Sequence, residues 1–218
     1  MGPALGGWSR RDGPPSAPGA CWRAGGWWYP DPVTGNVLLV GFMGAGKSSV
    51  GRLLARRLGR CFVETDDMIT AREGRSIPEI FADKGEAYFR ELEAEAVRLL
   101  RDKRGDVIAT GGGLPCRDGR MDQLKAIGTV IWLAAEFDTL FERAQRIGGR
   151  PMLAGRSRDD ARRLYDAREP FYRQADLAID TTRWGPDLVT AELLKRLRAR
   201  EARGPVAGAR AGAEEPHP

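Results

Sequence analysis

The hydrophobic residues of this chain gather in short, nearly continuous runs. The runs occupy residues 37–40, 61–63, 107–109, 129–133 and 177–179. Each has the length of a strand buried on both faces, and the segments between them are long enough for helices. Strands that alternate with helices predict a parallel sheet covered on both faces. The expected fold is therefore a three-layer α/β/α arrangement with a five-stranded parallel sheet.

Between these runs, apolar residues recur with the period of a helix. Helices are expected at 47–58, 67–73, 76–83, 86–103, 137–147, 158–174 and 186–203. In the segment 86–103 the apolar residues share one side, as they do in a helix packed on a core. Pro170 is expected to end or kink the helix that precedes it, because proline lacks an amide hydrogen.

The two ends of the chain differ in composition from the middle. Residues 1–34 are dense in glycine and proline, and residues 204–218 have low complexity. Such compositions predict disorder. We expect a disordered leader at 1–34, one ordered domain at 35–203 and a disordered tail at 204–218. Two alternatives to a disordered leader remain open. Its tryptophans could mark a docking segment, or translation could start further downstream.

Length and charge narrow the class of protein. The 218 residues suffice for one domain with a proper core. The net charge of +5 suits anionic ligands but is too small and too scattered to predict nucleic-acid binding. No apolar stretch has the length of a membrane span, and the three cysteines lack metal-ligand spacing. We expect a cytoplasmic monomer without nucleic-acid or membrane partners.

The first apolar run leads directly into a glycine-rich segment, GFMGAGKS at 41–48. In this pattern, Gly-x-x-x-x-Gly-Lys-Ser, backbone N–H groups surround a polyphosphate. Lys47 then reaches the β- and γ-phosphates, and the Ser48 hydroxyl holds Mg²⁺. The helix expected at 47–58 directs further N–H groups at the anion. The segment therefore predicts binding of a nucleoside triphosphate with Mg²⁺.

Carboxylates follow the second apolar run, at Glu64, Asp66 and Asp67. They are expected at the carboxyl edge of the sheet, where ligands bind in open α/β folds. There they can hold Mg²⁺ through water or accept a substrate proton, although Asp67 can instead cap a helix that begins near Met68. The only histidine is His217, so a general base in the core must be a carboxylate. Asp66 is the candidate.

Three further segments carry candidate binding residues. The three glycines of Thr110–Gly113 allow another molecule to approach the backbone closely. Arg90 and Glu93 are neighbours on a helix, so the carboxylate can hold the guanidinium, although a surface ion pair has the same spacing. Arg150 lies in a Gly- and Arg-rich stretch, 146–158, which can act as a mobile lid over phosphates or remain a solvated loop.

Taken in order, these motifs resemble those of the bacterial shikimate kinase family, small P-loop kinases of the nucleoside-monophosphate-kinase-like group. The resemblance covers about residues 36–200 and implies a P-loop NTPase fold with a mobile lid. The phosphate loop alone is shared by many NTPases, whereas the other motifs are far more specific. The resemblance is carried by GFMGAGKSSVGRLLA at 41–55, TDDMI at 65–69, GRSIPEIFADKGEAYFRELE at 74–93, TGGG at 110–113, RPML at 150–153 and REPFY at 168–172.

The resemblance implies that the chain transfers the γ-phosphoryl group of MgATP to the 3-hydroxyl of shikimate, giving shikimate 3-phosphate and ADP. It assigns Asp66 to the acceptor hydroxyl, Arg90 and Arg168 to the substrate carboxylate, and Gly112 to the ring substituents. The implied catalytic residues are Lys47, Asp66 and Arg150. The implied shikimate site comprises Asp66, Arg90, Gly111, Gly112, Gly113 and Arg168. The implied nucleotide site comprises Gly44, Ala45, Gly46, Lys47, Ser48, Ser49, Arg143, Arg150, Arg183 and Pro186.

One position departs from the family pattern, and two other functions remain open. Glu64 stands where the family has its first Asp, so we expect Ser48 with Glu64, acting through water, to hold Mg²⁺ with an altered affinity. The first alternative is another small-molecule kinase on this scaffold, such as a gluconate kinase. The second is a nucleotide-binding protein without catalysis.

Overall fold

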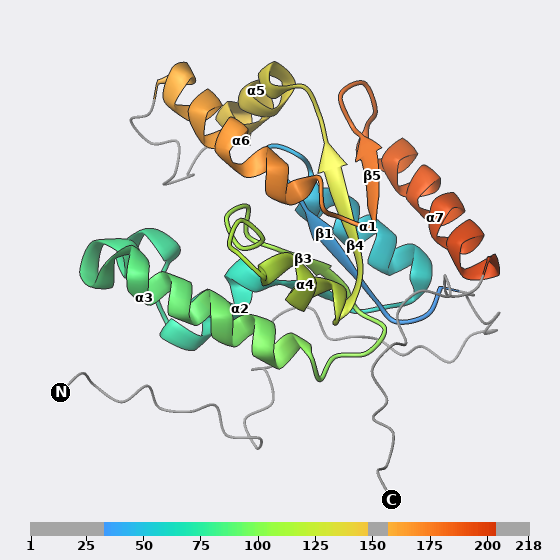
Figure 1. Cartoon of the computed structure of the whole chain (residues 1–218), viewed down its shortest axis with the longest axis horizontal. Coiled ribbons are helices and arrows are strands. Elements are labelled where there is room, and N and C mark those ends of the chain that lie inside the picture. The colour runs from blue at the N-terminus through green and yellow to red at the C-terminus, as the bar shows by residue number, and fades with distance from the viewer. Residues whose placement is uncertain (1–32, 148–156, 204–218) are drawn as a thin grey trace, which may run out of the picture.

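The computed structural model describes residues 33–147 and 157–203. Its five strands form one sheet in the order β2-β3-β1-β4-β5, and all neighbouring strands are parallel (Figure 1). The predicted parallel sheet is confirmed, with strand ends that differ from the expected ones by a residue or so. The strands are β1 (Asn36–Val40), β2 (Phe62–Glu64), β3 (Val107–Ala109), β4 (Gly128–Ala134) and β5 (Leu177–Asp180).

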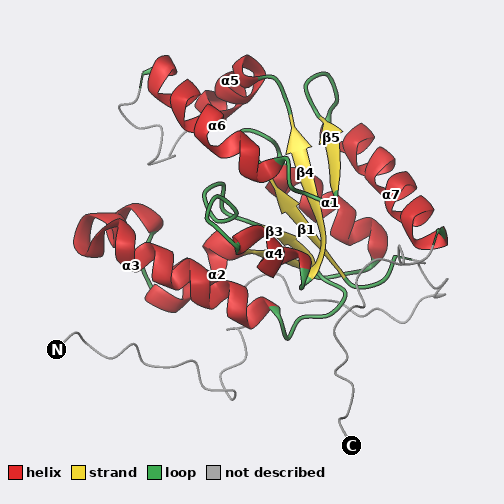
Figure 2. Ribbon diagram, in the orientation of Figure 1, coloured by secondary structure: helices red, strands yellow, loops and turns green. Residues whose placement is uncertain are grey.

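Helices cover both faces of this sheet. Figures 1 and 2 show α1 and α7 side by side on one face, with α3 and α4 on the other, so the three-layer arrangement is confirmed. The helices are α1 (Lys47–Leu58), α2 (Thr65–Glu73), α3 (Ile77–Leu100), α4 (Arg120–Lys125), α5 (Phe137–Ile147), α6 (Arg158–Tyr172) and α7 (Pro186–Ala202).

The centre of the sheet is fixed by β1, all of whose residues are buried. Asn36 begins this strand, and its side chain bridges the segments that precede β3 and β4. Its Nδ2 donates to the carbonyls of Lys103 at 2.9 Å and Ile127 at 3.1 Å, and its Oδ1 accepts from the amide of Asp106 at 2.9 Å. A buried amide side chain with these partners satisfies backbone groups where the strands start.

A second, smaller core lies between α2 and α3. It contains Ile69 of α2 and the α3 residues Ile80, Phe89, Leu92 and Ala96. The sequence predicted two helices here, at 76–83 and 86–103, and the structure confirms two helical stretches, which meet inside α3. The break between them is at Gly85, whose backbone is not helical (φ 75°, ψ 179°). Glycine is suited to this place because a residue with Cβ rarely adopts a positive φ.

Two helix boundaries and one short helix differ from the sequence expectation. Helix α2 begins at Thr65 rather than near Met68, so Asp67 lies in its first turn and is not its cap. Helix α6 continues through Pro170 and ends two residues later, at Tyr172. Proline has no amide hydrogen, so the last turn of the helix lacks the one bond that residue 170 would donate. The short helix α4 was not predicted, since six residues carry too little periodicity.

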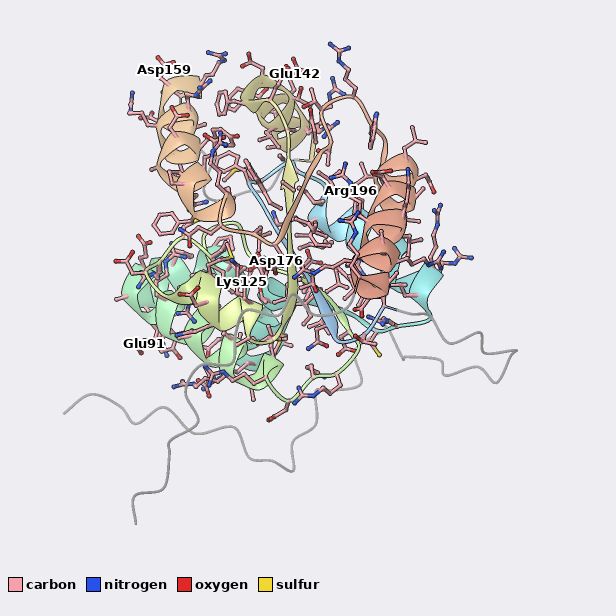
Figure 3. All side chains as sticks on the ribbon, turned by 45° about the vertical axis from the view of Figure 1, so that its right-hand side comes forward. Glu91, Lys125, Glu142, Asp159, Asp176 and Arg196 are labelled. Carbon is pink, nitrogen blue, oxygen red and sulfur yellow. The ribbon has the colours of Figure 1, made fainter. Side chains whose placement is uncertain are left out.

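Polar contacts attach the C-terminal helix and the turn before β5 to the sheet. Arg196 of α7 donates to the carbonyl of Ala178 in β5 at 3.0 Å, and Asp176 accepts from the amide of Val130 at 2.8 Å; Figure 3 labels Arg196 and Asp176. Of the expected leader, only residues 33 and 34 are described, and the tail at 204–218 lies outside the described residues. In the described ranges, no helix is both long and apolar enough to cross a membrane.

The pairing of β1 with β4 generates a stability prediction at Gly128. A Cβ at this position would lie 2.2 Å from the carbonyl oxygen of Asn36. Because backbone atoms of a paired strand cannot move aside, we expect Gly128→Ala to lower the free energy of unfolding by about 2 kcal/mol or more. Urea denaturation measures the change.

The matched control is Gly185→Ala, because a Cβ there has no atom within 4 Å. It should change the free energy of unfolding by less than about 1 kcal/mol. Equal losses in the two variants would contradict the account of the strand pairing.

Candidate active site

A cavity of about 800 Å³ opens at the carboxyl ends of β1, β2 and β3. The loop between β1 and α1, the start of α2 and the turn after β3 all contribute to its wall, and α3 and α6 add side chains. This is the edge of a parallel sheet at which ligands bind. Most of the residues predicted for the phosphate loop and all of those predicted for the acceptor site line this cavity.

The glycine-rich loop after β1 forms one end of the cavity. Gly44 and Gly46 have φ values of 81° and 86°, and a Cβ on Gly44 would lie 2.2 Å from the carbonyl oxygen of Leu140. The Lys47 ammonium donates to the carbonyls of Gly41 at 2.8 Å and Phe42 at 3.0 Å, which places its charge at the loop. Of the predicted loop residues, Gly44, Gly46, Lys47, Ser48 and Ser49 line the cavity, whereas Ala45 is buried in the core.

A serine and a carboxylate meet beside this loop. The Ser48 hydroxyl donates to Oε1 of Glu64, and Arg52 lies 3.3 Å from the other carboxylate oxygen. The Arg52 guanidinium also stacks over the ring of Phe62 at 4.7 Å. Two neighbouring oxygen ligands suit a small hard cation that keeps most of its water. Within the described ranges, no group of three or more His, Cys, Asp and Glu side chains forms a metal cluster.

Asp66 lies in the first turn of α2 and faces the turn after β3. Its Oδ1 would be 2.6 Å from a Cβ on Gly111, so a larger residue there would displace the carboxylate. Burial, assisted by the charges of Glu93, Glu64 and Asp67 and opposed by Lys47, raises the pKa of Asp66 to about 6. The carboxylate is therefore ionised at neutral pH but is a better proton acceptor than an ordinary aspartate.

Two guanidinium groups converge on the same turn. A Cβ on Gly113 would lie 3.0 Å from Nη1 of Arg90 and 3.1 Å from Nη2 of Arg168. Arg90 comes from α3 and Arg168 from α6, so the side chains reach this point from different parts of the fold. Two guanidinium groups at one point form a fork that fits a small carboxylate or phosphate.

The position of Arg90 is fixed by carboxylates of its own helix. Its Nη1 donates to Glu93 at 2.8 Å and its Nη2 to Glu86 at 2.6 Å. Glu93 is only 3% exposed, so this pair differs from the surface ion pair considered in the sequence analysis. Arg168 is itself buried, 8% exposed, and its guanidinium lies 6.0 Å from the ring of Phe42.

Apolar side chains form a wall of the cavity that sequence reasoning did not assign. Phe81 and Phe89 pack with ring centroids 4.7 Å apart, and Met43, Ile77 and Pro78 line the cavity with them. Such a surface suits the carbon skeleton of a ligand. The signal in the sequence is the apolar side expected for 86–103, which contains Phe89, but helical spacing does not distinguish a cavity wall from core packing. Thr65 was also missed, although its Oγ1 accepts from the amide of Gly111 at 2.9 Å.

The residues predicted to hold the base of the nucleotide lie in α5 and after β5 and are not part of the cavity lining. Arg143 of α5 donates to the carbonyls of Thr181 at 2.9 Å and Thr182 at 3.1 Å, in the loop after β5. Arg183 and Pro186 belong to the same connection and are exposed. None of the predicted base-side residues lines the cavity. Arg150 and residues 148–156 of the predicted lid lie outside the described residues.

The comparisons with known proteins agree with one another. The family model described as shikimate kinase matches residues 43–198. A shikimate kinase from Symbiobacterium thermophilum is 46% identical over 173 residues, covering 78% of this chain and 99% of that protein. A structure titled shikimate kinase from Acinetobacter baumannii in complex with shikimate has a TM-score of 0.72 and 34% identity, covering 76% of this chain and 94% of that one.

A gluconokinase from Sinorhizobium meliloti is a more distant structural neighbour. It has a TM-score of 0.50 and 20% identity, and covers 78% of this chain and 95% of that chain. At this level of identity the likeness shows the fold alone.

The raised pKa of Asp66 generates a second stability prediction. The folded protein binds this proton more tightly than the unfolded chain, so ionising Asp66 lowers the free energy of unfolding as the pH rises from about 4 through 6. Asp66→Asn removes that ionisation. We expect the variant to be more stable than the parent by about 1 to 3 kcal/mol at pH 8, and by less at pH 4.5.

Urea denaturation at both pH values measures the difference. Asp67→Asn, at the exposed neighbouring position, is the control and should change the free energy of unfolding by less than about 0.5 kcal/mol. A stabilisation of the Asp66 variant that is independent of pH would contradict the assignment.

Proposed function

The chain belongs to the shikimate kinase family, and from this premise we propose that it phosphorylates the 3-hydroxyl of shikimate with ATP. The products are shikimate 3-phosphate and ADP, and the reaction is a step of the shikimate pathway. The observation that carries the proposal is the convergence of Arg90 and Arg168 at Gly113, in the same cavity as the glycine-rich loop.

The carboxylate of shikimate fits between the two guanidinium groups. Arg90 and Arg168 can each donate two parallel hydrogen bonds, which fixes the plane of the carboxylate as well as its position. The carbon ring then contacts the apolar wall that contains Phe81 and Phe89. Because the turn at Gly111–Gly113 carries no side chains, the ring substituents can approach its backbone.

Asp66 is the proposed base for the 3-hydroxyl. It lies beside Gly111 and interacts with the charge of Lys47, so it is situated between the acceptor site and the phosphate loop. Its pKa of about 6 keeps it ionised at neutral pH and allows it to orient the hydroxyl and accept its proton. Asp66 and the two arginines together position the acceptor oxygen for attack on the γ-phosphorus.

The phosphate loop and nearby cations would neutralise the transferring group. Lys47 is placed at the loop, and Arg150 of the expected lid would add a second positive charge. The adjoining oxygens of Ser48 and Glu64 fit Mg²⁺, with Glu64 acting through water, and bound Mg²⁺ would offset the charge of the phosphates. The Ser48 hydroxyl donates its hydrogen to Glu64 and keeps its oxygen lone pairs, so it could hold the cation without giving up this contact.

The base of ATP is assigned to the loop after β5. Arg143 is anchored there by carbonyls of Thr181 and Thr182, and Arg183 and Pro186 provide the neighbouring exposed surface. Arginine planes and proline rings offer flat surfaces on which an aromatic base can pack. A monomeric state, a cytoplasmic location and the lack of nucleic-acid or membrane partners stay predictions of the sequence.

The proposed activity is tested by ADP release in the presence of different acceptors. With MgATP, shikimate should stimulate ADP release far above the rate without acceptor, whereas gluconate and other polyol acids should not. Preference for gluconate would support the rival kinase. Nucleotide binding without stimulation by any acceptor would support a non-catalytic protein and overturn the proposal.

We call Arg90 and Arg168 together the carboxylate clamp. Removing one of these two arginines should weaken the binding of shikimate and leave the binding of ATP unchanged. We expect Arg168→Ala to raise the KM for shikimate by about 100-fold, because a buried charge-assisted contact is lost, with the KM for ATP nearly unchanged. Arg163→Ala is the control: this arginine is on the same helix, is 72% exposed in its side chain and pairs with the surface residue Asp160. Unaltered shikimate kinetics in Arg168→Ala would remove Arg168 from the site.

A further inference from the structure

Each carbonyl of the triple-glycine turn accepts a hydrogen bond, but the donors are of different kinds. The carbonyl of Gly111 accepts from the amide of Leu114, and that of Gly113 from the amide of Cys116, both at 3.1 Å. These two bonds are local to the turn. The carbonyl of Gly112 instead accepts from the hydroxyl of Tyr172 at 2.6 Å. The orientation of this middle carbonyl therefore depends on another element, α6.

The ring of Tyr172 is buried in the core, and its hydroxyl points to the carbonyl of Gly112. The side chain is 0% exposed, and its ring stacks on Trp132 with centroids 6.2 Å apart. It follows Arg168 by one turn of α6, so both residues project from the same face of the helix. Burial raises the pKa of Tyr172 well above its ordinary value, so the hydroxyl keeps its proton and remains a donor.

The bond from Tyr172 fixes a whole peptide unit. The carbonyl of Gly112 and the amide N–H of Gly113 belong to one planar peptide group and point in opposite directions. If the carbonyl faces buried Tyr172, the Gly113 N–H faces away from it. Among residues 33–147 and 157–203, none accepts a hydrogen bond from this N–H. Gly113 is also the residue at which the two guanidinium groups converge.

A restraint on this peptide is needed because glycine lies on both sides of it. A peptide unit turns over through changes in the ψ of the residue before it and the φ of the residue after it. Glycine tolerates both signs of φ, so the Gly112–Gly113 peptide can turn over more readily than a peptide between residues that carry Cβ. The Cys116 thiol is 3.6 Å from the Gly112 carbonyl, and a thiol is a weak donor. The Tyr172 hydroxyl is the stronger donor to this carbonyl.

We propose that Tyr172 is a positioning residue, whose hydroxyl orients the Gly112–Gly113 peptide so that the Gly113 amide donates to the carboxylate bound by Arg90 and Arg168. This inference rests on the proposed function. The clamp then has three donors to one anion, two from side chains and one from the backbone. Helix α6 supplies both Arg168 and the restraint on the backbone donor, so one element sets the geometry of both.

The test is Tyr172→Phe, which removes the hydroxyl and keeps the ring on Trp132. Loss of one hydrogen bond to a charged ligand predicts that the KM for shikimate rises about ten-fold. The KM for ATP and kcat should change by less than about three-fold, because the phosphate loop and Asp66 are untouched. A variant that only loosened the fold would change both KM values together.

Tyr165→Phe is the matched control. Tyr165 is on the same helix, is 8% exposed, and its hydroxyl makes a long contact of 3.4 Å to Glu169. This variant should leave both KM values within about two-fold of the parent. An equal rise in the KM for shikimate in the two variants would overturn the inference, as would a rise of less than two-fold in Tyr172→Phe.

A spectroscopic measurement separates this inference from the proposed function. Glycine labelled with ¹³C at the carbonyl and ¹⁵N at the amide selects signals from Gly–Gly pairs, and the Gly112–Gly113 signal should shift in Tyr172→Phe without any substrate. In the parent, shikimate should perturb the same signal. A parent that does not use shikimate refutes the proposed function alone, whereas an active parent whose Gly112–Gly113 signal is unchanged by Tyr172→Phe refutes the positioning role.

Discussion

The site depends on a steric constraint, the absence of side chains at Gly111 and Gly113 in the turn after β3. A Cβ on Gly111 would lie 2.6 Å from the Asp66 carboxylate, and a Cβ on Gly113 would lie 3.0 Å from the Arg90 guanidinium. Charged groups from three elements can therefore approach one turn of backbone. Any larger residue would separate the carboxylate from the acceptor, or would occupy the space where the anion binds. The chemistry of the cavity follows from this close approach.

The same crowding creates an electrostatic problem that the fold solves locally. Two guanidinium groups at one point repel each other, but Glu93 and Glu86 neutralise Arg90 from within its own helix. The site thus keeps enough positive charge to attract a carboxylate, and its geometry is fixed before the ligand arrives. At Asp66, burial and the neighbouring carboxylates outweigh the charge of Lys47, so the pKa of Asp66 is raised. The raised pKa suits Asp66 to proton transfer.

Each of the two hydrophobic cores positions a different part of the site. The large core under the sheet positions the phosphate loop and, through α6, Arg168 and Tyr172. The small core between α2 and α3 positions Asp66 and Arg90, with Phe89 belonging both to that core and to the cavity wall. The acceptor site is therefore assembled between two packing units. A difference in how these units pack is a physical route by which relatives on the same fold can accept different substrates.

Local features were determined by the sequence alone. The apolar runs located the strands, the glycine-rich segment located the phosphate loop, and the spacing of Arg90 and Glu93 gave their ion pair, because each of these depends on residues a few positions apart. The convergence of Arg90 with Arg168 was expected only through a family resemblance. The bond from Tyr172 to Gly112 and the apolar wall were not expected at all. Those contacts join distant segments, and only the packing of α3 and α6 over the end of β3 decides which distant side chains meet.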